Sequence, residues 1–356
     1  MCMGRLSPLS SAVPTIDLAA LTDAGKAAGF TACGIAPCRP SDQAAALDAW
    51  LRRGAHAGMR WLETTAETRK DLRRRWPWAR SALVGVASYL ARPRDRRALG
   101  GIARHVARYA HGQDYHRTLT AWLVEWAAAV ERLHGGPFRR AVLVDTSAVL
   151  ERELAVRAGL GWIGRNSCLI GPEGNSWTVI GVVLTALELP HSTPALLDRC
   201  GSCTACLDAC PTGAIPEPYV VDSNRCTSYL TIEHRGPIDD GLAAAMGDWL
   251  FGCDVCQEVC PWNRRARPDA APEFQADPRY AGLTLEGVAR MDVAAFREAF
   301  RGTPLARPKR AGMVRNALIA GANLGDDGVR RAAAELADDE EEAVRRAARW
   351  ALGQFR

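Results

Sequence analysis

Eight of the twelve cysteines fall within residues 200–260, and their spacing constrains the fold more than any other feature of the sequence. The first run has the spacing Cys-x2-Cys-x2-Cys-x3-Cys-Pro and ends at Pro211, which is the bacterial ferredoxin pattern. A second run, Cys-x2-Cys-x3-Cys-Pro, ends at Pro261. In two-cluster ferredoxins the fourth cysteine of each run binds the other cluster. We therefore expect two neighbouring 4Fe–4S clusters, one held by Cys200, Cys203, Cys206 and Cys260 and the other by Cys210, Cys226, Cys253 and Cys256.

Two structural zinc sites are the alternative, because four thiolates on Cys-x2-Cys pairs also bind zinc. Zinc sites do not require three cysteines at these spacings followed by proline, so the pattern favours iron–sulfur clusters. The remaining cysteines share no spacing, and we expect them to be plain thiols: Cys2, Cys33, Cys38 and Cys168.

The sequence shows neither a signal-peptide pattern nor a stretch long enough to span a membrane. Residues 1–17 hold no apolar core of signal-peptide length. The longest uncharged apolar stretch, residues 177–187, is shorter than the roughly 20 residues that a membrane-spanning helix needs. We therefore expect a cytoplasmic protein with no membrane segment, where clustered cysteines bind metal more often than one another.

The 356 residues leave room for two or three domains. Up to about residue 190, helical patterns alternate with short apolar runs of strand composition. The predicted helices cover residues 18–28, 44–53, 116–133 and 148–158, and the predicted strands cover 31–36, 81–89, 141–144 and 178–189. The fold class is therefore multidomain α/β or α+β, with a first domain at 1–190, a ferredoxin-like domain at 191–270 and a helical domain at 271–356.

The helical C-terminal region contains a weak internal echo. The segment Val314-Arg315-Asn316-Ala317 recurs thirty residues later as Val344-Arg345-Arg346-Ala347, and both segments continue into helical patterns. Pairs of this kind are typical of HEAT-like repeats, although the period is shorter than usual. The alternative is an ordinary amphipathic helical tail.

The modest net charge of +5 is unevenly distributed along the chain. Residues 91–140 hold ten arginines against four acids, and residues 262–315 hold eleven basic residues against six acids. An acidic block at 338–342 partly offsets them. The two basic segments would flank a polyanion, or they are simply solvated helix faces.

Asp145 is the most suggestive single acid, because it directly follows the predicted strand at 141–144. Open α/β sheets bind ligands at their strand ends. Apolar neighbours there would raise the pKa of the carboxyl group and allow it to donate a proton near neutral pH. The alternative is that Asp145 caps the helix that follows.

The glycines of Gly159-Leu160-Gly161-Trp162-Ile163-Gly164 match the dinucleotide-binding fingerprint by letter. The fingerprint requires a preceding strand and a following helix, whereas this segment follows a predicted helix. We interpret these glycines as a helix stop followed by a tight loop.

Several of these motifs, taken together, resemble one family, that of the epoxyqueuosine reductases. The resemblance runs from about residue 18 to the end of the chain, with a shortened helical tail. It is carried by 108–116 (Arg-Tyr-Ala-His-Gly-Gln-Asp-Tyr-His), Val144-Asp145-Thr146, 159–166, 200–214, 226–233 and 253–263. Arg165 departs from the lysine that is common in the family, with the positive charge retained.

The resemblance implies a cobalamin-dependent enzyme that reduces epoxyqueuosine to queuosine at the wobble position of tRNA. It implies an α/β cobalamin-binding domain, two 4Fe–4S clusters, a HEAT-like tail and a monomer served by an external one-electron donor such as a flavodoxin or ferredoxin. By motif position, Asp145 matches the proton donor. The positions that match contacts to cob(II)alamin are Arg69, Ala107, Asp145, Leu169, Ile180, Ser228 and Asp254.

In the implied mechanism, electrons pass through the clusters to cobalamin, and Asp145 protonates the oxygen of the opened epoxide. The two basic segments would then contact phosphates of the anticodon loop. Two other classes remain open at this point: a cobalamin-dependent reductive dehalogenase, and a ferredoxin-like electron-transfer protein with no catalysis of its own.

Overall fold

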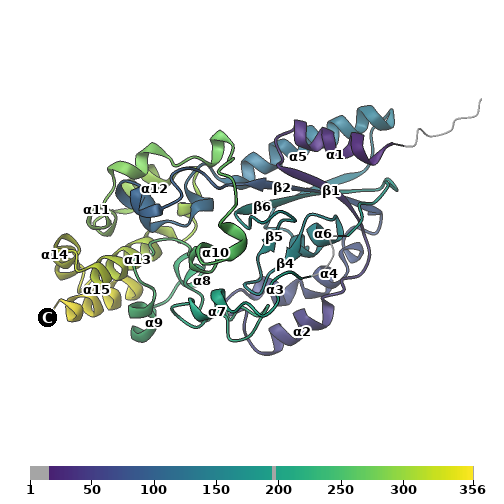
Figure 1. The fold of residues 1–356 in the computed structure, drawn as a ribbon. Coiled ribbons are helices and arrows are strands. Elements are labelled where there is room, and N and C mark those ends of the chain that lie inside the picture. The colour runs from purple at the N-terminus through teal and green to yellow at the C-terminus, as the bar shows by residue number, and fades with distance from the viewer. Residues whose placement is uncertain (1–15, 195–197, 356) are drawn as a thin grey trace, which may run out of the picture.

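The computed structural model of the chain describes residues 16–194 and 198–355, so Cys2 lies outside the described part. A four-stranded sheet with its helices occupies one end of the molecule, and the C-terminal helices occupy the other (Figure 1). The cysteine-rich segment lies between them. No helix in the described ranges has the length and apolar character needed to cross a membrane.

The sheet consists of β1 (Ala32–Pro37), β2 (Ser81–Ser88), β6 (Thr178–Thr185) and β3 (Arg140–Leu143), in the order β1-β2-β6-β3. Every neighbouring pair is antiparallel. Apolar runs buried on both faces produce these strands, and all of β2 is buried. The predicted mixture of helices and strands is confirmed, and Asp145 follows the end of β3 as expected.

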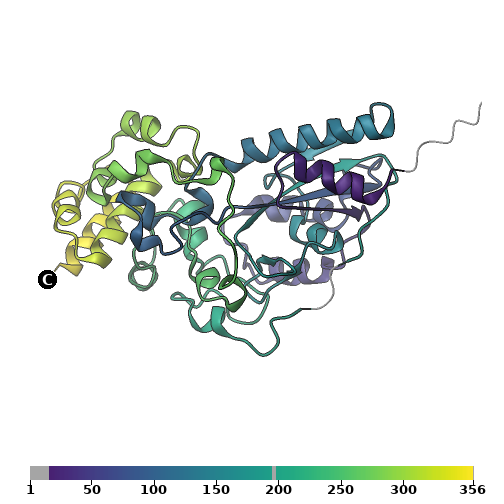
Figure 2. The ribbon, with the colours of Figure 1, turned by 45° about the horizontal axis from the view of Figure 1, so that its top comes forward.

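Helices cover both faces of the sheet. α1 (Leu18–Ala27) and α5 (Tyr115–His134) lie along one face, as Figure 2 shows, and α6 (Glu151–Arg157) lies on the other. Alternation along β2 explains the two layers, because Leu83 packs with the α1 and α5 residues while Ala82 and Val84 pack with α6.

The remaining secondary structure on this side of the molecule is short. Three helices connect β1 to β2, and a two-stranded ribbon follows α6: α2 (Ala44–Arg52), α3 (Arg60–Thr64), α4 (Ala66–Lys70), β4 (Trp162–Ile163) and β5 (Leu169–Ile170). The cysteine-rich segment contains only α7 (Ala205–Asp208), α8 (Thr227–Ile232), α9 (Asp240–Ala245) and α10 (Val255–Glu258). Such short helices fit a region where bound metal replaces an apolar core.

The C-terminal region consists of α11 (Leu285–Ala289), α12 (Val293–Phe300), α13 (Lys309–Leu324), α14 (Asp327–Glu335) and α15 (Glu342–Gln354). α13 is its buried centre and packs against α11, α14 and α15. A side chain at Gly321 would collide with Val329 of α14, so glycine allows these two helices to approach closely. The same core includes Ile102 and Val106, so part of the predicted first domain packs in this helical lobe.

Arg315 of α13 is completely buried and connects the helical lobe to the cysteine-rich segment. Its guanidinium donates hydrogen bonds to the carbonyl groups of Leu230, His234 and Gly236 at 2.6, 3.0 and 2.7 Å. Asn316 donates to the carbonyl groups of Thr231 and Leu250. Burial lowers the pKa of Arg315 to about 10, which leaves it charged at neutral pH.

Candidate functional site

Asp145 lies two residues beyond the end of β3, with its backbone in the left-handed region at φ +51°. This conformation is uncommon for a residue other than glycine, asparagine or aspartate. The helix that follows, α6, begins only at Glu151, and no side chain caps it. The helix-capping interpretation is therefore wrong, and the 64% exposed side chain of Asp145 is available to a ligand.

The first turn of α5 supplies the partners of Asp145. The Tyr115 hydroxyl donates a 2.8 Å hydrogen bond to Oδ2, and Nε2 of His116 lies 3.4 Å from the same oxygen. Nδ1 of His116 lies 2.7 Å from Oδ1 of Asp114, the N-cap residue of α5. The Tyr115 and His116 rings stack with their centroids 4.2 Å apart. An imidazole is thus held between two carboxylates.

These contacts reverse the expected pKa shift of Asp145. Burial among protein atoms raises its pKa, but His116 and the hydrogen bond from Tyr115 outweigh that effect, so the net pKa is lowered. Asp114 and then Asp145 raise the pKa of His116 to about 9. In the free protein at neutral pH, the carboxyl group is therefore ionised and the proton resides on His116, which corrects the predicted raised pKa.

Glu151 and Arg69 lie behind Asp145. Burial, followed by the negative charge of Asp145, raises the pKa of Glu151 to about 8, and one of its carboxyl oxygens is buried without a hydrogen-bond partner. Arg69 donates a 2.9 Å hydrogen bond to the carbonyl group of Val149 and lies close enough to both acids for their charges to act on it. Arg69 was predicted from the family resemblance, whereas no motif in the sequence marks Glu151.

The other positions matched to cobalamin contacts fall into two groups. Leu169 of β5 and Ile180 of β6 pack in one apolar cluster below the sheet. Ala107 and Asp254 lie close together, because the backbone N–H of the next residue, Arg108, donates a 2.8 Å hydrogen bond to Oδ2 of Asp254. Ser228 lies on α8.

The surroundings of Asp254 suit a bound cofactor. Its side chain is 1% exposed, burial raises its pKa to about 7, and its second carboxyl oxygen has no partner in the described chain. The charges of Asp145 and Asp254 both act on the hydroxyl group of Tyr109, so the two carboxyl groups lie near the same ring. The orphaned oxygen of Asp254 suits an amide donor such as those on the rim of a corrin, whereas Leu169 and Ile180 would support such a group from the core behind it.

The structure brings the first predicted set of cysteines together. Burial, and after it the charges of Cys200, Cys260 and Cys203, raise the pKa of Cys206 to about 11. Cys260 and Cys200 also pack against Trp162 and Ile170. Arg165 donates to the carbonyl groups of Gly201 and Cys203, so its positive charge anchors the loop that carries these ligands.

The second set is likewise a group of neighbours. Burial raises the pKa of Cys253, and the charges of Asp254, Cys226 and Cys210 add to that rise. Cys256 lies beside Cys253 and Cys226. In the described chain, no three histidine, cysteine or acidic side chains converge closely enough to hold one metal ion. A 4Fe–4S cube is wider than a single ion, so its four thiolates stand further apart.

Of the cysteines predicted to be plain thiols, two lie away from the cysteine-rich segment and one lies beside it. Cys33 lies on β1 and Cys38 directly after it, and burial raises the pKa of each to about 12, as expected for inert thiols. Cys168 instead lies within hydrogen-bonding reach of Cys256. No spacing in the sequence marks that contact.

The glycine-rich segment is the predicted helix stop and loop. Gly159 follows α6 with φ +76°, and Gly161 precedes Trp162 of β4 with φ +148°. A Cβ atom at Gly161 would lie 2.1 Å from the carbonyl oxygen of Ile170, so the two-stranded ribbon requires glycine there.

The two basic segments meet in space. Arg94 of the first segment donates a 2.8 Å hydrogen bond to the carbonyl group of Asn263, and a 3.3 Å hydrogen bond to that of Arg264, in the second. Arg307, from the same second segment, instead lies on the Asp145 side, where it pairs with Glu233 and sits 5.9 Å from the Trp61 ring.

Two groups of neighbouring thiols with ferredoxin spacing, joined to an α/β domain, are typical of an iron–sulfur oxidoreductase. Residues 199–263 match the family described as "4Fe-4S double cluster binding domain", and residues 69–146 match that described as "Epoxyqueuosine reductase QueG, DUF1730".

Comparison with whole proteins extends this match over the full chain. The chain is 36% identical to the epoxyqueuosine reductase of Xanthomonas campestris pv. campestris, covering 96% of this chain and 97% of that protein. It is 40% identical to that of a Synechococcus species, covering 82% and 90%. A crystal structure of an epoxyqueuosine reductase with an epoxyqueuosine-modified tRNA-Tyr stem loop superposes with a TM-score of 0.83 at 29% identity, covering 94% and 89%. The chain belongs to the epoxyqueuosine reductase family and is an oxidoreductase.

Proposed function

We propose that this protein reduces epoxyqueuosine at the wobble position of tRNA to queuosine, as a cytoplasmic monomer. The observation that carries the proposal is the open Asp145 carboxylate held by Tyr115 and His116, in a chain of this family. The reaction consumes two electrons and two protons, because the epoxide oxygen leaves as water and its two carbons become an alkene.

Two groups of residues would hold the cofactors. The eight cysteines would bind two 4Fe–4S clusters in the crossed arrangement, which their proximity supports. Cobalamin would lie between Asp145 and Asp254, against Leu169 and Ile180. When bound, it supplies the low-potential cobalt chemistry that no side chain can provide.

Asp145 would deliver the proton that the departing oxygen needs. Its carboxylate is ionised in the free protein, and His116 carries a proton 3.4 Å away. A substrate that covers Asp145 excludes water and favours its neutral form, so the proton moves from His116 to Oδ2 and then to the oxygen. The Tyr115 hydroxyl holds the carboxylate in place at 2.8 Å.

The cations around Asp145 would position the RNA. Arg307 is exposed and close enough to Asp145 for the carboxylate charge to act on it. It would contact a phosphate of the anticodon stem loop, and the exposed Trp61 ring beside it would stack on a base. We propose that α13–α15 form a HEAT-like unit that supports this face.

The test is Asp145→Asn, which keeps the shape of the side chain and removes its acid. With a modified stem loop and a chemical reductant under anaerobic conditions, we expect queuosine formation to fall by about 100-fold or more. Iron content and cobalamin content should stay at the wild-type level. Full turnover by the variant with both cofactors bound would disprove the proton-donor role.

A further inference from the structure

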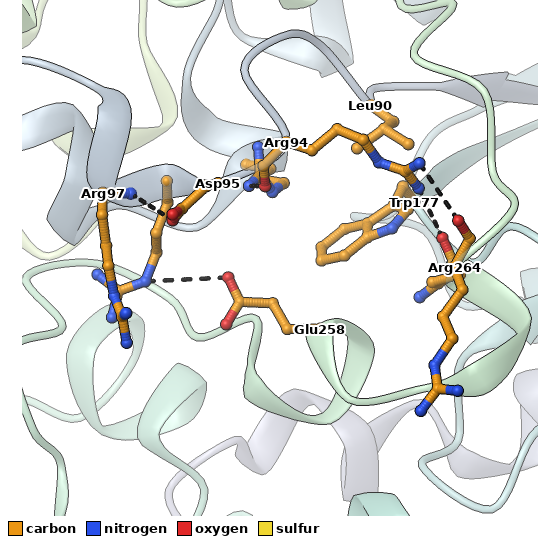
Figure 3. A pocket seen from close by; sticks show the side chains of 10 residues that line it. Leu90, Arg94, Asp95, Arg97, Trp177, Glu258 and Arg264 are labelled. Atoms are coloured by element: carbon orange, nitrogen blue, oxygen red, sulfur yellow. Dashed lines mark hydrogen bonds and ion pairs between the residues drawn. The ribbon is translucent and has the colours of Figure 1, made fainter.

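A cavity of about 400 Å³ is lined by Leu90, which follows β2, by Trp177, which precedes β6, and by Glu258 of the cysteine-rich segment (Figure 3). Its lining contains five arginines and only two acids, Asp95 and Glu258; the arginines are Arg94, Arg96, Arg97, Arg108 and Arg264. Arg97 and Arg264 stand at opposite sides, with Trp177 and Glu258 between them. The side chains that line the cavity therefore carry a net positive charge.

Neighbouring acids offset only part of this charge, because five arginines face Asp95, Glu258 and the Asp248 partner of Arg96. Arg94 and Arg108 donate to backbone carbonyl groups, and Arg96 has the carboxylates of Asp248 and Glu258 as partners. Within the described ranges, Arg97 and Arg264 form no ion pair. Arg108 is 3% exposed, lies over the Trp177 ring, and its Nε is buried without a partner. These unsatisfied donors favour an anionic occupant.

The wall of the cavity reaches a cluster ligand. Asn263 and Glu258, which line it, flank Cys260 in the sequence. The N–H of Asn263 donates to the carbonyl oxygen of Cys260 at 3.0 Å, and the N–H groups of Trp262 and Asn263 also act on the Cys260 sulfur. An electron carrier seated in the cavity would thus lie next to the cluster of Cys200, Cys203, Cys206 and Cys260.

The cavity is separate from the reaction site. A row of aromatic rings runs from Trp177, which lines the cavity, to Tyr115 beside Asp145. Between them lie Tyr89 and Tyr109, with neighbouring centroids 5.9–6.4 Å apart. An RNA base at Asp145 therefore does not occupy the cavity, and an electron donor could bind while the substrate is in place.

We propose that this cavity, with Arg97 and Arg264 at its edges, is the docking site of an acidic one-electron carrier protein of the flavodoxin or ferredoxin class. The carrier loses one electron and the cluster that includes Cys260 gains it, with no bond formed or broken. Surface carboxylates of the carrier would contact the arginines. The inference rests on the proposed clusters but not on the identity of the RNA substrate.

The test reverses the charge at the two edges with the double variant Arg97→Glu/Arg264→Glu. The matched control is Arg132→Glu/Arg297→Glu, which changes the same net charge at two exposed positions away from the cavity. Bleaching of the oxidised clusters by photoreduced flavodoxin is followed by stopped-flow absorbance, without any epoxyqueuosine. We expect the second-order rate at low salt to fall by about tenfold or more in the cavity variant only, with a weaker salt dependence.

Two parallel measurements separate carrier docking from cluster damage and from RNA binding. Dithionite, a small reductant, should reduce the clusters of all three proteins at equal rates, and iron content should be equal. The unmodified stem loop should bind all three with equal affinity. An unchanged flavodoxin rate would overturn the proposal, and so would a loss of stem-loop affinity specific to the cavity variant, which would assign the cavity to RNA.

Discussion

The position of His116 between two carboxylates makes its removal a sharp test of proton delivery. Its pKa rises from 6.5 to about 9, which corresponds to about 3.4 kcal/mol of interaction with Asp114 and Asp145. A third of the side chain is exposed, so solvent screening reduces this to about 2 kcal/mol. At neutral pH, His116 therefore holds almost one full proton beside Asp145.

His116→Asn removes that proton while leaving the Tyr115 hydrogen bond to Asp145 intact. An isolated carboxyl group near its ordinary pKa is protonated in only about one molecule in a thousand at pH 7. We therefore expect the rate of queuosine formation to fall by about 100- to 1000-fold at pH 7, with partial recovery toward pH 5.5. In the wild-type protein, the rate should stay level up to about pH 9 and then fall.

The assay is anaerobic single turnover of a modified stem loop between pH 5.5 and 9.5, with nucleosides quantified by mass spectrometry. His134→Asn at the other end of α5 is the matched control. Asp114→Asn should move the alkaline limb downward by about one pH unit, because it removes the largest cause of the raised pKa. A wild-type rate and pH profile in His116→Asn, at equal iron and cobalamin content, would refute this reasoning. So would an imidazole NMR titration with a pKa near 6.5.

Three further changes test other parts of the site. Cys260→Ala removes one ligand of the cluster that contains Cys200, so iron should fall from about eight to about four atoms per chain, with the second cluster still visible by EPR after reduction. Glu151→Gln should stabilise the cofactor-free protein at high pH. The folded-state pKa of Glu151 is about 8 against 4.5 unfolded, so its contribution is present below pH 4.5 and lost as the pH rises to 8. The gain at pH 9 should approach about 5 kcal/mol in urea unfolding. Arg307→Glu should weaken stem-loop binding by about tenfold and reduce the slope of log affinity against log salt by about one.

A specific outcome would contradict each of these three predictions. Loss of all iron in Cys260→Ala would mean that the two cysteine sets do not assemble independently. Equal stability of Glu151→Gln and wild type at both pH 6 and pH 9 would show that Glu151 ionises freely. An unchanged salt slope in Arg307→Glu would remove Arg307 from the RNA contact.

Features encoded by local spacing were predictable from the sequence. The cysteine runs predicted both sets of neighbouring thiols, since a few residues between ligands leave little freedom. The four helices and four strands predicted before residue 190 match α1, α2, α5, α6, β1, β2, β3 and β6 to within one residue at each end, apart from the late start of α6 and the early end of β6. Hydrophobic periodicity determines these elements before any tertiary contact forms.

Features created by contacts between distant segments were not predictable. Nothing in a single sequence indicates that β6 inserts between β2 and β3 or that all the strands are antiparallel. The pKa of Asp145 depends on His116, 29 residues earlier, and the sequence analysis assumed apolar neighbours instead. The arginine-lined cavity requires Arg94 to meet Asn263, from opposite sides of the cluster segment.

Arg315 has a consequence for how the protein is made. Its three backbone partners lie in and just after α8, the helix that begins directly after Cys226, and Arg315 cannot reach them until α13 has been synthesised. We expect the ligand loop from Cys226 to Cys253 to stay open on the ribosome, so cluster insertion follows chain completion. Chains truncated after residue 308 should therefore bind less iron in reconstitution than full-length chains, and equal iron would show that the loop closes without α13.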